Sequence, residues 1–356
     1  MAKVFAGMSG GVDSSVTAAL LVEQGHAVTG VYMKNWTQDM PGMRCPWADD
    51  LADAKRVAVQ LGIPLKVYDF QEEYRQKVVD YMLAEYQAGR TPNPDVMCNQ
   101  EVKFRLFLET ALTDGAEMIA TGHYARVEHE EVGLGSSGQS HGKLLRAVDD
   151  AKDQTYFLYR VSGQALGKTL FPLGEYTKNH VREIAQSRGL VTARKKDSQG
   201  ICFVGSVGIR EFLQEFVETQ PGDIVDKSTN QVLGQHDGAI YYTLGQRHGL
   251  DIGGGTPYYV VGKNMERNEV LVSRNLDDES MWQDNLALDQ IHWINRPAEN
   301  GEKLQVRLRH RGTLHDAVYS DGQLDMQSSE RAVAAGQSAV LYQGNEVLGG
   351  GIVAET

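Results

Sequence analysis

The chain has few cysteines, few prolines and no long apolar run, and each shortage excludes a class of protein. Its 356 residues include three cysteines, Cys45, Cys98 and Cys202, too few for a disulfide-stapled scaffold or a zinc site with four cysteine ligands. The 38 glycines and nine prolines are too few and too scattered for a collagen-like or wholly disordered chain. No apolar run approaches the ~18–20 residues that cross a bilayer, and the first residues become glycine-rich and polar before a signal-peptide core could form. We therefore expect a cytoplasmic protein, in whose reducing surroundings thiols more often do chemistry than hold structure.

Positive charge is also scarce, because 35 Lys and Arg stand against 47 Asp and Glu, for a net charge of −12 at pH 7. On net charge alone a nucleic-acid partner is not expected, since binding phosphates requires positive charge. Basic residues nevertheless gather in two segments, 178–196 and 307–311. In the second, Arg307, Arg309 and Arg311 alternate along a predicted strand, which places them on one face suited to phosphates. A solvated strand face explains the same alternation without a nucleic acid.

The pattern of apolar residues predicts an α/β fold at the start of the chain. An apolar run over 3–7, a glycine-rich turn, a helical pattern over 14–24 and a β-branched run over 27–33 form a β-α-β unit. Strand and helix patterns continue to alternate over the first ~200 residues, which is typical of a doubly wound, mostly parallel sheet. Within this part, the Gly/Ser-rich segment 128–142 lies between two strand-like runs and predicts a hairpin loop.

The pattern changes from Gly205 onward, where short alternating runs with turn residues between them predominate. Such runs are typical of small β domains. We therefore expect three domains: a catalytic domain with a doubly wound sheet of the adenine-nucleotide α-hydrolase kind at 1–204, a small central mostly-β domain at 205–278, and a C-terminal β-barrel-like domain at 279–356.

The most informative short segment is GMSGGVDSS at 7–15, between the first strand and the first helix. Its glycines allow the backbone to approach an anion, and the N–H groups at the helix start point toward it. The segment has neither the lysine of a P-loop nor the spacing of a dinucleotide-binding loop. Asp13 suits a magnesium-linked or loop-ordering role. The alternative is an ordinary Gly-Ser turn in which Asp13 caps the helix.

A second dense segment is TPNPDVMCN at 91–99. Two prolines fix a loop that presents Asn93, Asp95 and Cys98. If a helical turn begins here, Asp95 and Cys98 project from the same side. A carboxylate and a thiol so placed suit acid/base and nucleophilic roles. A proline-capped helix start with a small buried cysteine explains the segment equally well.

The third segment is KKDSQGICF at 195–203. Basic neighbours should acidify the Cys202 thiol and favour the thiolate that carries or attacks sulfur. In a reducing compartment, any pairing of Cys202 with Cys98 would be transient and catalytic. Cys45 has no comparable surroundings, and we expect it to be noncatalytic.

Together these segments resemble the bacterial tRNA-specific 2-thiouridylase (MnmA) family, whose loop is of the ATP-pyrophosphatase type. The resemblance extends over nearly the whole chain. It rests on seven segments in a fixed order: GMSGGVDSSV (7–16), TPNPDVMCN (91–99), ATGHYAR (120–126), KDQTYFL (152–158), DSQGICF (197–203), YTLGQRHGL (242–250) and LGGGI (348–352).

The resemblance implies that ATP adenylates O2 of the wobble uridine of tRNA, because AMP is a far better leaving group than oxide. Sulfur then replaces it, which gives 2-thiouridine, AMP and pyrophosphate. Cys202 would carry a persulfide delivered by a sulfur-relay carrier protein. Cys98 would be the nucleophile or resolving thiol that ends in a Cys98–Cys202 disulfide, and Asp95 the acid/base. The target base must be flipped out, since C2 of a stacked base is poorly reachable.

The resemblance also implies binding residues. ATP, accompanied by Mg²⁺, would contact Gly7, Met8, Ser9, Gly10, Gly11, Val12, Asp13, Ser14, Met33 and Gly122. The tRNA would contact Asn93, Pro94, Asp95, His123, Lys152, Asp153, Gln154, Arg309, His310 and Gln337. No further metal site, no membrane contact and a monomeric state are expected.

Two other functions remain as alternatives. An amidotransferase-type synthetase or argininosuccinate-type ligase could use the same loop, but it would not need paired cysteines. An RNA-binding or sulfur-carrier protein could use ATP only for regulation, in which case ATP turnover would not depend on tRNA.

Overall fold

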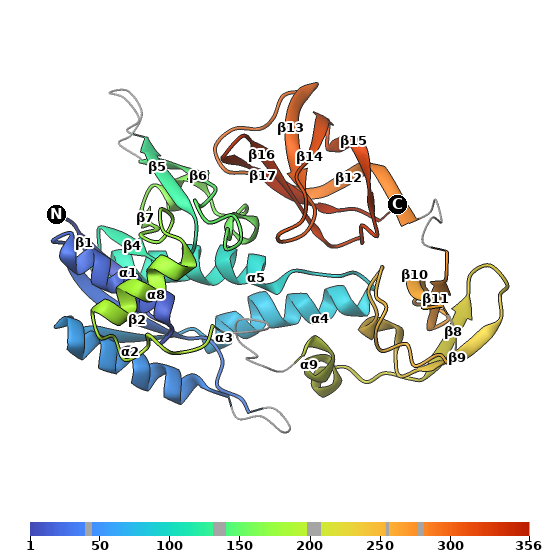
Figure 1. Ribbon diagram of the computed structural model, residues 1–356, viewed down its shortest axis with the longest axis horizontal. Coiled ribbons are helices and arrows are strands. Elements are labelled where there is room, and N and C mark those ends of the chain that lie inside the picture. Colours follow the sequence, from blue (N-terminus) through green and yellow to red (C-terminus); the bar gives the residue numbers. More distant parts are fainter. Residues whose placement is uncertain (40–44, 131–139, 198–207, 254–255, 276–280, 356) are drawn as a thin grey trace.

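The computed structural model describes residues 1–39, 45–130, 140–197, 208–253, 256–275 and 281–355 (Figure 1). Three sheets organise these residues: a five-stranded sheet near the N-terminus, a four-stranded sheet, and an eight-stranded sheet near the C-terminus. Within the described residues, no helix is long and apolar enough to cross a membrane.

The first sheet confirms the predicted doubly wound α/β fold. Its strands are all parallel to their neighbours and run in the order β3-β2-β1-β4-β7. They are β1 (Lys3–Gly7), β2 (Ala27–Lys34), β3 (Leu65–Asp69), β4 (Met118–Ala120) and β7 (Thr169–Leu170). The chain moves outward from β1 in one direction to β3 and then returns to place β4 on the other side, so the order reverses at β1. In sheets of this kind, ligands bind at the carboxyl ends of the strands where the order reverses.

Helices cover both faces of this sheet because successive strand residues point to opposite sides. On β1, Val4 and Ala6 pack in one cluster with residues of α1 (Val12–Glu23) and α2 (Trp47–Leu61). Phe5 packs in a different cluster, with residues of α6 (Phe107–Thr113). α8 (Lys178–Ser187) lies outside α1 and shares a further cluster with it.

Between β3 and β4 the chain forms two helical runs, each interrupted by π-helical winding. The first consists of α3 (Gln71–Tyr74), η1 (Arg75–Val79) and α4 (Asp80–Gln87), and the second of α5 (Pro94–Met97), η2 (Cys98–Leu106) and α6. Inserted π-helical turns are uncommon and are frequent at functional sites. Further along the chain, η3 (Thr155–Phe157) and α7 (Gly163–Leu166) lie before β7, and α9 (Ile209–Phe216) follows α8.

The β-rich remainder also agrees with the sequence pattern. The four-stranded sheet has the order β10-β11-β8-β9. Its elements are β8 (Gly222–Asp226), β9 (Val232–His236), the short helix η4 (Ala239–Tyr241), β10 (Tyr259–Asn264) and β11 (Glu269–Ser273).

The C-terminal sheet closes on itself, because β12 pairs with both β15 and β17. Its strands are β12 (Trp282–Trp293), β13 (Glu302–Arg307), β14 (His315–Ser320), β15 (Gln323–Arg331), β16 (Ser338–Gln343) and β17 (Glu346–Val353). The barrel encloses a separate apolar core that includes Leu286, Val306 and Leu341.

A hairpin from the first part of the chain, the part that contains the five-stranded sheet, pairs with the barrel. The predicted hairpin around 128–142 is formed by β5 (Arg126–Glu130) and β6 (His141–Leu145), and its segment 131–139 lies outside the described residues. β6 pairs with β17, with Leu144 opposite Val347. The hairpin thus extends the barrel sheet although it belongs to the N-terminal half of the chain.

Candidate functional site

The loop after β1 has the geometry of an anion-binding turn. Gly10 has φ +75°, and a Cβ there would lie 2.2 Å from the Asp50 carbonyl oxygen, so only glycine fits. The hydroxyls of Ser14 and Ser15 donate to the Gly11 carbonyl at 3.1 and 2.7 Å. These bonds hold the turn in place while α1 begins at Val12, which leaves the first amides of the helix directed at the space above β1.

The chain after β4 passes directly over the same turn. A Cβ on Gly122 would lie 3.0 Å from the Ser14 nitrogen and 3.1 Å from the Asp13 carbonyl carbon. The two loops therefore meet at the point where the strand order reverses. A side chain at position 122 would push them apart.

A cavity of about 290 Å³ opens at this junction. Seven of the ten predicted ATP-binding residues line it: Gly7, Met8, Ser9, Asp13, Ser14, Met33 and Gly122. It is also lined by three residues that were predicted from the other motifs, namely Cys98, His123 and Gln154. Sequence analysis missed ten lining residues: Tyr32, Asn35, Trp36, Cys45, Pro46, Trp47, Asp50, Tyr74, Lys103 and Thr121. Most of these residues lie just beyond the end of β2 or around the start of α2. None of the three sequence motifs extends into these segments, so the sequence did not indicate them.

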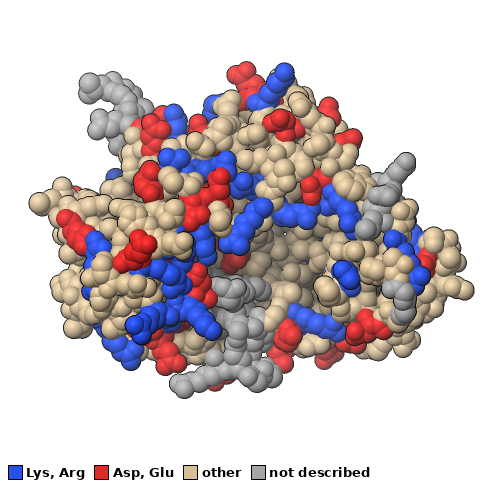
Figure 2. Space-filling view, viewed as in Figure 1, with Lys and Arg blue, Asp and Glu red and all other residues tan. Residues whose placement is uncertain are grey.

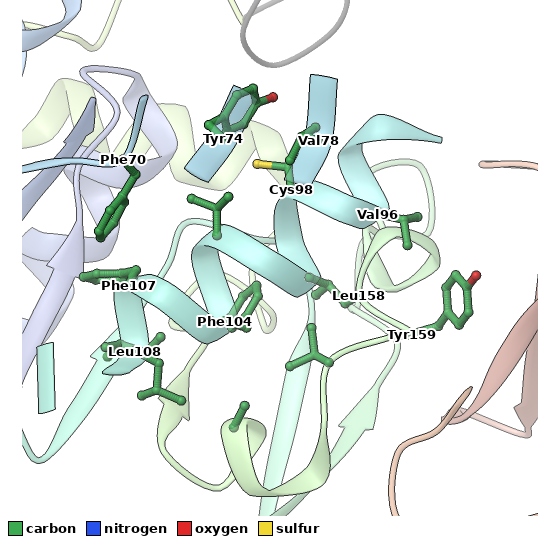
Figure 3. Packing of buried hydrophobic residues seen from close by; sticks show 14 of the residues in the cluster. Phe70, Tyr74, Val78, Val96, Cys98, Phe104, Phe107, Leu108, Leu158 and Tyr159 are labelled. Carbon is green, nitrogen blue, oxygen red and sulfur yellow. The ribbon is translucent and has the colours of Figure 1, made fainter. Parts of the chain in front are cut away.

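Cys98 reaches this cavity from the start of η2. Pro94 begins α5, and the Asn93 side-chain oxygen accepts hydrogen bonds from the amides of Asp95 and Val96 at 3.2 and 3.3 Å, which caps the helix. Cys98 is 2% exposed and lies beside Tyr74 and Val78 (Figure 3). Asp95 is partly exposed and does not appear among the described residues that line the cavity. The predicted helical turn is therefore present, but of its two reactive groups the thiol is the one at the cavity.

The other cysteine that the structure describes, Cys45, also lines the cavity. It is 6% exposed, its amide donates to Asp39 Oδ1 at 2.8 Å, and its Sγ lies 3.7 Å from the Trp36 carbonyl oxygen. Burial raises the pKa of the Cys45 thiol. A protonated thiol is a poor nucleophile, which favours the noncatalytic character expected for Cys45.

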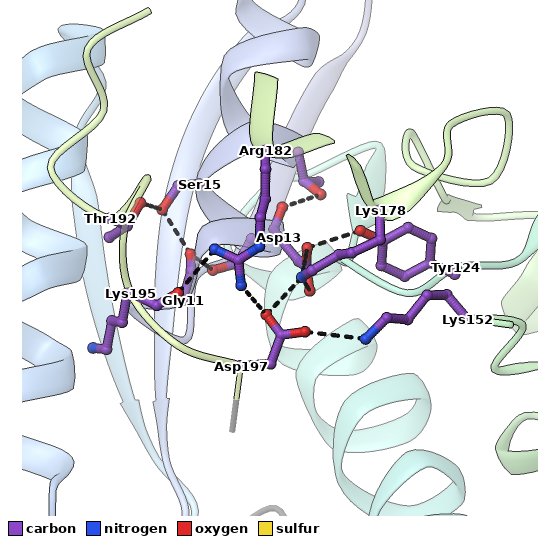
Figure 4. A network of polar contacts seen from close by, with 12 residues as sticks. Gly11, Asp13, Ser15, Tyr124, Lys152, Lys178, Arg182, Thr192, Lys195 and Asp197 are labelled. Carbon is purple, nitrogen blue, oxygen red and sulfur yellow. Dashed lines mark hydrogen bonds and ion pairs between the residues drawn. The ribbon is translucent and has the colours of Figure 1, made fainter. Parts of the chain in front are cut away.

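Asp13 does not cap α1, because the helix has Gly11 at that position without a side-chain hydrogen bond. Its two carboxylate oxygens instead lie 2.7 and 2.8 Å from the Lys178 ammonium, and Tyr124 Oη donates to one of them at 2.9 Å (Figure 4). Lys178 is 8% exposed and is the first residue of α8. The loop that lacks a P-loop lysine in its own sequence therefore has a lysine beside it, supplied from 165 positions further along the chain.

Asp197 completes this network. It forms ion pairs with Lys178 at 2.9 Å, Arg182 at 2.6 Å and Lys152 at 3.1 Å. Burial alone would raise the pKa of the Asp197 carboxyl, but hydrogen bonds from Lys178 and Lys152 and their charges lower it to about 2. Cys202, five positions later, lies outside the described residues, as does any contact between it and Cys98.

Of the predicted tRNA-binding residues outside the barrel, His123 and Gln154 line the cavity. His123 Nδ1 is 2.8 Å from Thr121 Oγ1, and its ring packs against Phe104 with centroids 5.7 Å apart. Burial, together with the charge of Lys103, holds the pKa of His123 well below its ordinary value, so the ring is neutral near pH 7. Gln154 Oε1 accepts from the Tyr124 amide at 2.9 Å.

Asp153 is placed differently from its neighbours, since it is 1% exposed. Its carboxylate accepts from the Ala147 amide at 3.0 Å and from Thr155 Oγ1 at 2.8 Å, and it pairs with Arg307 of the barrel at 3.3 Å. The expected direct contact between Asp153 and tRNA does not fit this burial. An effect of Asp153 on tRNA binding would act through the turn that carries Lys152 and Gln154.

The prediction of a single basic strand over 307–311 is wrong. β13 ends at Arg307, the chain turns with a bond from the Gly312 amide to the Arg309 carbonyl, and Arg311 has φ +61°. Arg307 is buried, and Arg309 pairs with Glu330. The alternation of arginines could not reveal that the strand stops before the second of them.

The two remaining predicted barrel residues lie on turns that face the first part. The His310 ring is 4.6 Å from that of Phe157, and burial lowers the pKa of His310. Gln337 Oε1 accepts from the Ala334 amide at 3.4 Å. The same turn touches the segment with Cys98, because the Thr91 amide donates to the Ala335 carbonyl at 3.1 Å.

The basic segment 178–196 is largely neutralised, contrary to the local charge count. Beyond Lys178 and Arg182, Arg188 pairs with Glu23, and Lys195 pairs with Asp50 and Asp53 at 2.7 and 2.6 Å. These acids belong to α1 and α2, far away in the sequence. Figure 2 shows Lys and Arg side chains around the hollow between the barrel, the first part and the four-stranded sheet.

A metal site was not expected beyond the ion that accompanies ATP. Among the residues that the structure describes, no group of three or more His, Cys, Asp or Glu side chains is placed to hold a metal ion.

Comparison with known proteins gives a consistent result. Family models match residues 2–206 (tRNA methyl transferase HUP domain), 210–274 (tRNA methyl transferase PRC-barrel domain) and 283–353 (aminomethyltransferase β-barrel domain). The chain is 45% identical over 360 residues to a tRNA-specific 2-thiouridylase MnmA of Lysinibacillus sphaericus, covering 99% of this chain and 94% of that one. It is 44% identical over 359 residues to the MnmA of Bacillus subtilis, with 99% and 94% covered. A solved 4-thiouridine synthetase–RNA complex with bound ATP is 17% identical, covers 60% of this chain and 50% of that one, and gives a TM-score of 0.38, a similarity too low to support an argument.

Proposed function

Since the chain belongs to the tRNA-specific 2-thiouridylase family, we propose that it is an ATP-dependent tRNA sulfurtransferase that converts the wobble uridine to 2-thiouridine. The observation that carries this proposal is the cavity itself. One space of about 290 Å³ is lined by the anion-binding loop and by the Cys98 thiol, although they lie about ninety positions apart in the chain. Activation by a nucleotide and transfer of sulfur require these two groups in one place.

ATP binds with its phosphates on the loop from Gly7 to Ser14, where the first backbone amides of α1 supply the donors, while the Ser14 and Ser15 hydroxyls hold the turn through the Gly11 carbonyl. Met33 and Gly122 line the same space. Lys178 places a buried positive charge beside Asp13 at the start of α1. A magnesium ion takes oxygen ligands, and Asp13 is the loop carboxylate that would hold it. Both Asp13 oxygens accept from the Lys178 ammonium, so this ammonium would have to move aside for the ion. Bound there, the ion would neutralise phosphate charge.

Adenylation begins when uridine O2 attacks the α-phosphorus and pyrophosphate leaves. The terminal sulfur of a persulfide on Cys202 then bonds to C2. Cys98 attacks the Cys202 sulfur, the bond between Cys202 and the transferred sulfur breaks, and AMP leaves as the C2–sulfur double bond forms. The reaction ends with a Cys98–Cys202 disulfide, which a thiol must reduce before the next cycle. Asp95 serves as acid/base, and Asn93, Pro94 and Asp95 hold the flipped base.

The tRNA contacts His123, Lys152 and Gln154 near the cavity and Arg309, His310 and Gln337 on the barrel. We further propose that a sulfur-relay carrier protein delivers the sulfur and that the chain works as a monomer in a reducing cytoplasm. The domain division at 1–204, 205–278 and 279–356 remains a prediction.

The decisive experiment is incubation with ATP, a sulfide source and unmodified tRNA, followed by mass analysis of the nucleosides. We expect 2-thiouridine, and its absence would refute the proposal. The control is tRNA that already carries 2-thiouridine, which should gain no sulfur. Pyrophosphate release should depend on unmodified tRNA, whereas release indifferent to tRNA would favour a binding protein with a regulatory ATP loop.

The cysteine assignment has its own test. Cys98→Ser and Cys202→Ser should each abolish thiolation from a persulfide donor. A synthetase or ligase that shares only the loop would retain its turnover in both variants. Normal thiolation rates in both would show that the sulfur roles are wrong.

A further inference from the structure

The helix that begins with Cys98 is wound so that Lys103 shares its face. η2 (Cys98–Leu106) is π-helical, and the Phe107 amide at its end donates to the Val102 carbonyl, five residues earlier. In an α-helix, five residues correspond to a rotation that leaves the two side chains about 140° apart. In π-helical winding, where the hydrogen bond spans five residues, the fifth residue comes round to the same side. Cys98 and Lys103 accordingly both line the cavity.

Lys103 is a distinctive group in that space. Of the described residues that line the cavity, it is the one with a formal positive charge at pH 7. Its charge acts on another lining residue, because burial and then the charge of Lys103 lower the pKa of His123. The other titratable groups that face the cavity are Asp13, Asp50, Tyr32, Tyr74, Cys45 and His123.

These neighbours make an unassisted thiolate at Cys98 unfavourable. Cys98 is 2% exposed in a largely apolar cluster, and burial disfavours the charged form of a thiol. Asp13 and Asp50 line the same space, but Lys178 and Lys195 pair with them, so the apolar surroundings are the main cost of a thiolate. A nearby cation has the opposite effect and stabilises the thiolate.

We propose that Lys103 is a positioning residue that acts through Cys98, its ammonium group holding the cysteine sulfur in the thiolate form that attacks Cys202. This rests on the proposed function, since that attack is the step in which Cys98 takes part. A bond forms between the two cysteine sulfurs, and the bond from the Cys202 sulfur to the transferred sulfur breaks. Its electron pair stays on the transferred sulfur, so the step needs no proton from Cys98 and no further oxidant.

The first test measures Cys98 alone, without ATP or tRNA. The full-length protein is alkylated with iodoacetamide across a range of pH, and the peptide containing Cys98 is quantified by mass spectrometry. In the wild type, the midpoint of the rate profile should lie below the ~8.5 of a free cysteine. A wild-type midpoint at or above that value would overturn the proposal, and this measurement requires no variant to fold.

Variants then isolate the charge. Lys103→Met should raise the midpoint by at least about one pH unit, which is a roughly tenfold slower alkylation at pH 7, whereas Lys103→Arg should leave it nearly unchanged. The Cys45 peptide serves as the internal reference, and a parallel change there would show a general loosening of the cavity and overturn the assignment to Lys103. An unchanged Cys98 midpoint in Lys103→Met would also overturn it.

The last test connects the charge to the reaction. Thiolation by Lys103→Met from a persulfide donor should fall about tenfold at pH 7 and recover as the pH is raised by one to two units, a dependence that a merely structural role would not produce. A shifted alkylation midpoint with an unchanged thiolation rate would refute the role in the reaction. If the wild type forms no 2-thiouridine, the proposed function fails, while the alkylation profiles still decide whether Lys103 controls the Cys98 thiol.

Discussion

The ion pair between Asp153 and Arg307 is a buried connection between the first part of the chain and the barrel. The side chains are 0% and 9% exposed, and Arg307 Nη1 lies 3.3 Å from Asp153 Oδ2. Asp153 sits between Lys152 and Gln154, which approach Asp197 and the cavity. We predict that Arg307→Met destabilises the protein and displaces this turn.

The size of the effect follows from what remains around Asp153. Removing one partner of a buried pair typically costs about 3–5 kcal/mol, because a charge is left uncompensated. The Ala147 amide and Thr155 Oγ1 still donate to Asp153 and offset part of that cost, so we expect about 3 kcal/mol. At about 2–4 °C per kcal/mol for a domain of this size, the Tm should fall by roughly 6–12 °C. The double variant Asp153→Asn with Arg307→Met should recover at least half of the loss, because replacing both partners removes the buried charge.

The assay is calorimetric unfolding, compared through transition midpoints because a chain with several domains need not unfold in one step. The matched control is Arg309→Met, two positions further along. Its side chain is 53% exposed and pairs with Glu330, and an exposed pair contributes at most about 1 kcal/mol. If Arg307→Met melts within 2 °C of the wild type, or if the double variant is less stable than the single, the reasoning about a buried charge is wrong.

Three further predictions concern the cavity and its surroundings. Gly122→Ala should weaken ATP binding about tenfold or more in calorimetric titration, since its Cβ would crowd the Ser14 amide at 3.0 Å; equal affinity would show that the loop can move without loss. Because the pKa of Asp197 is lowered to about 2, its ion pairs should stabilise the protein fully above about pH 4 and lose their effect as the pH falls toward 2. The Tm of Asp197→Asn should therefore be lower than that of the wild type at pH 7 and approach it in acid, and a constant gap would contradict the assignment. Binding of tRNA should weaken steeply with salt despite the net charge of −12, and a flat dependence in filter binding would exclude phosphate contacts.

The contiguous parts of the site could be predicted from the sequence. The turn at 7–15 depends on neighbouring residues only: a strand ends, glycines permit the tight backbone, and α1 follows at once. The capped turn at Asn93 is similarly local. Both segments contain the residues and the order of elements that their chemistry requires, so a pattern in the sequence was sufficient.

The partners of those residues could not be predicted, because they come from distant elements. Lys178 approaches Asp13 only after α8 has packed against α1. Arg307 meets Asp153 only because the barrel docks on the first part. Lys103 was overlooked for a different reason: five residues from Cys98 it should point elsewhere in an α-helix, and nothing in the local sequence indicates π-helical winding.

The electrostatics of tRNA binding follow from these same pairings. A cation that already contacts a carboxylate gains little from a phosphate unless the carboxylate is displaced, and four of the basic residues in 178–196 are paired in this way. Arg194 and Lys196 are exposed in the same segment, so they can neutralise phosphate without breaking an ion pair within the described part of the chain. Each phosphate neutralised contributes about 0.9 to the slope of log affinity against log salt on a duplex. The magnitude of this slope should therefore fall by about one unit on Lys196→Ala. It should change little on Arg188→Ala, because the Arg188 guanidinium is held by Glu23. A larger fall in slope for Arg188→Ala than for Lys196→Ala would show that tRNA displaces Glu23 rather than using the exposed cations.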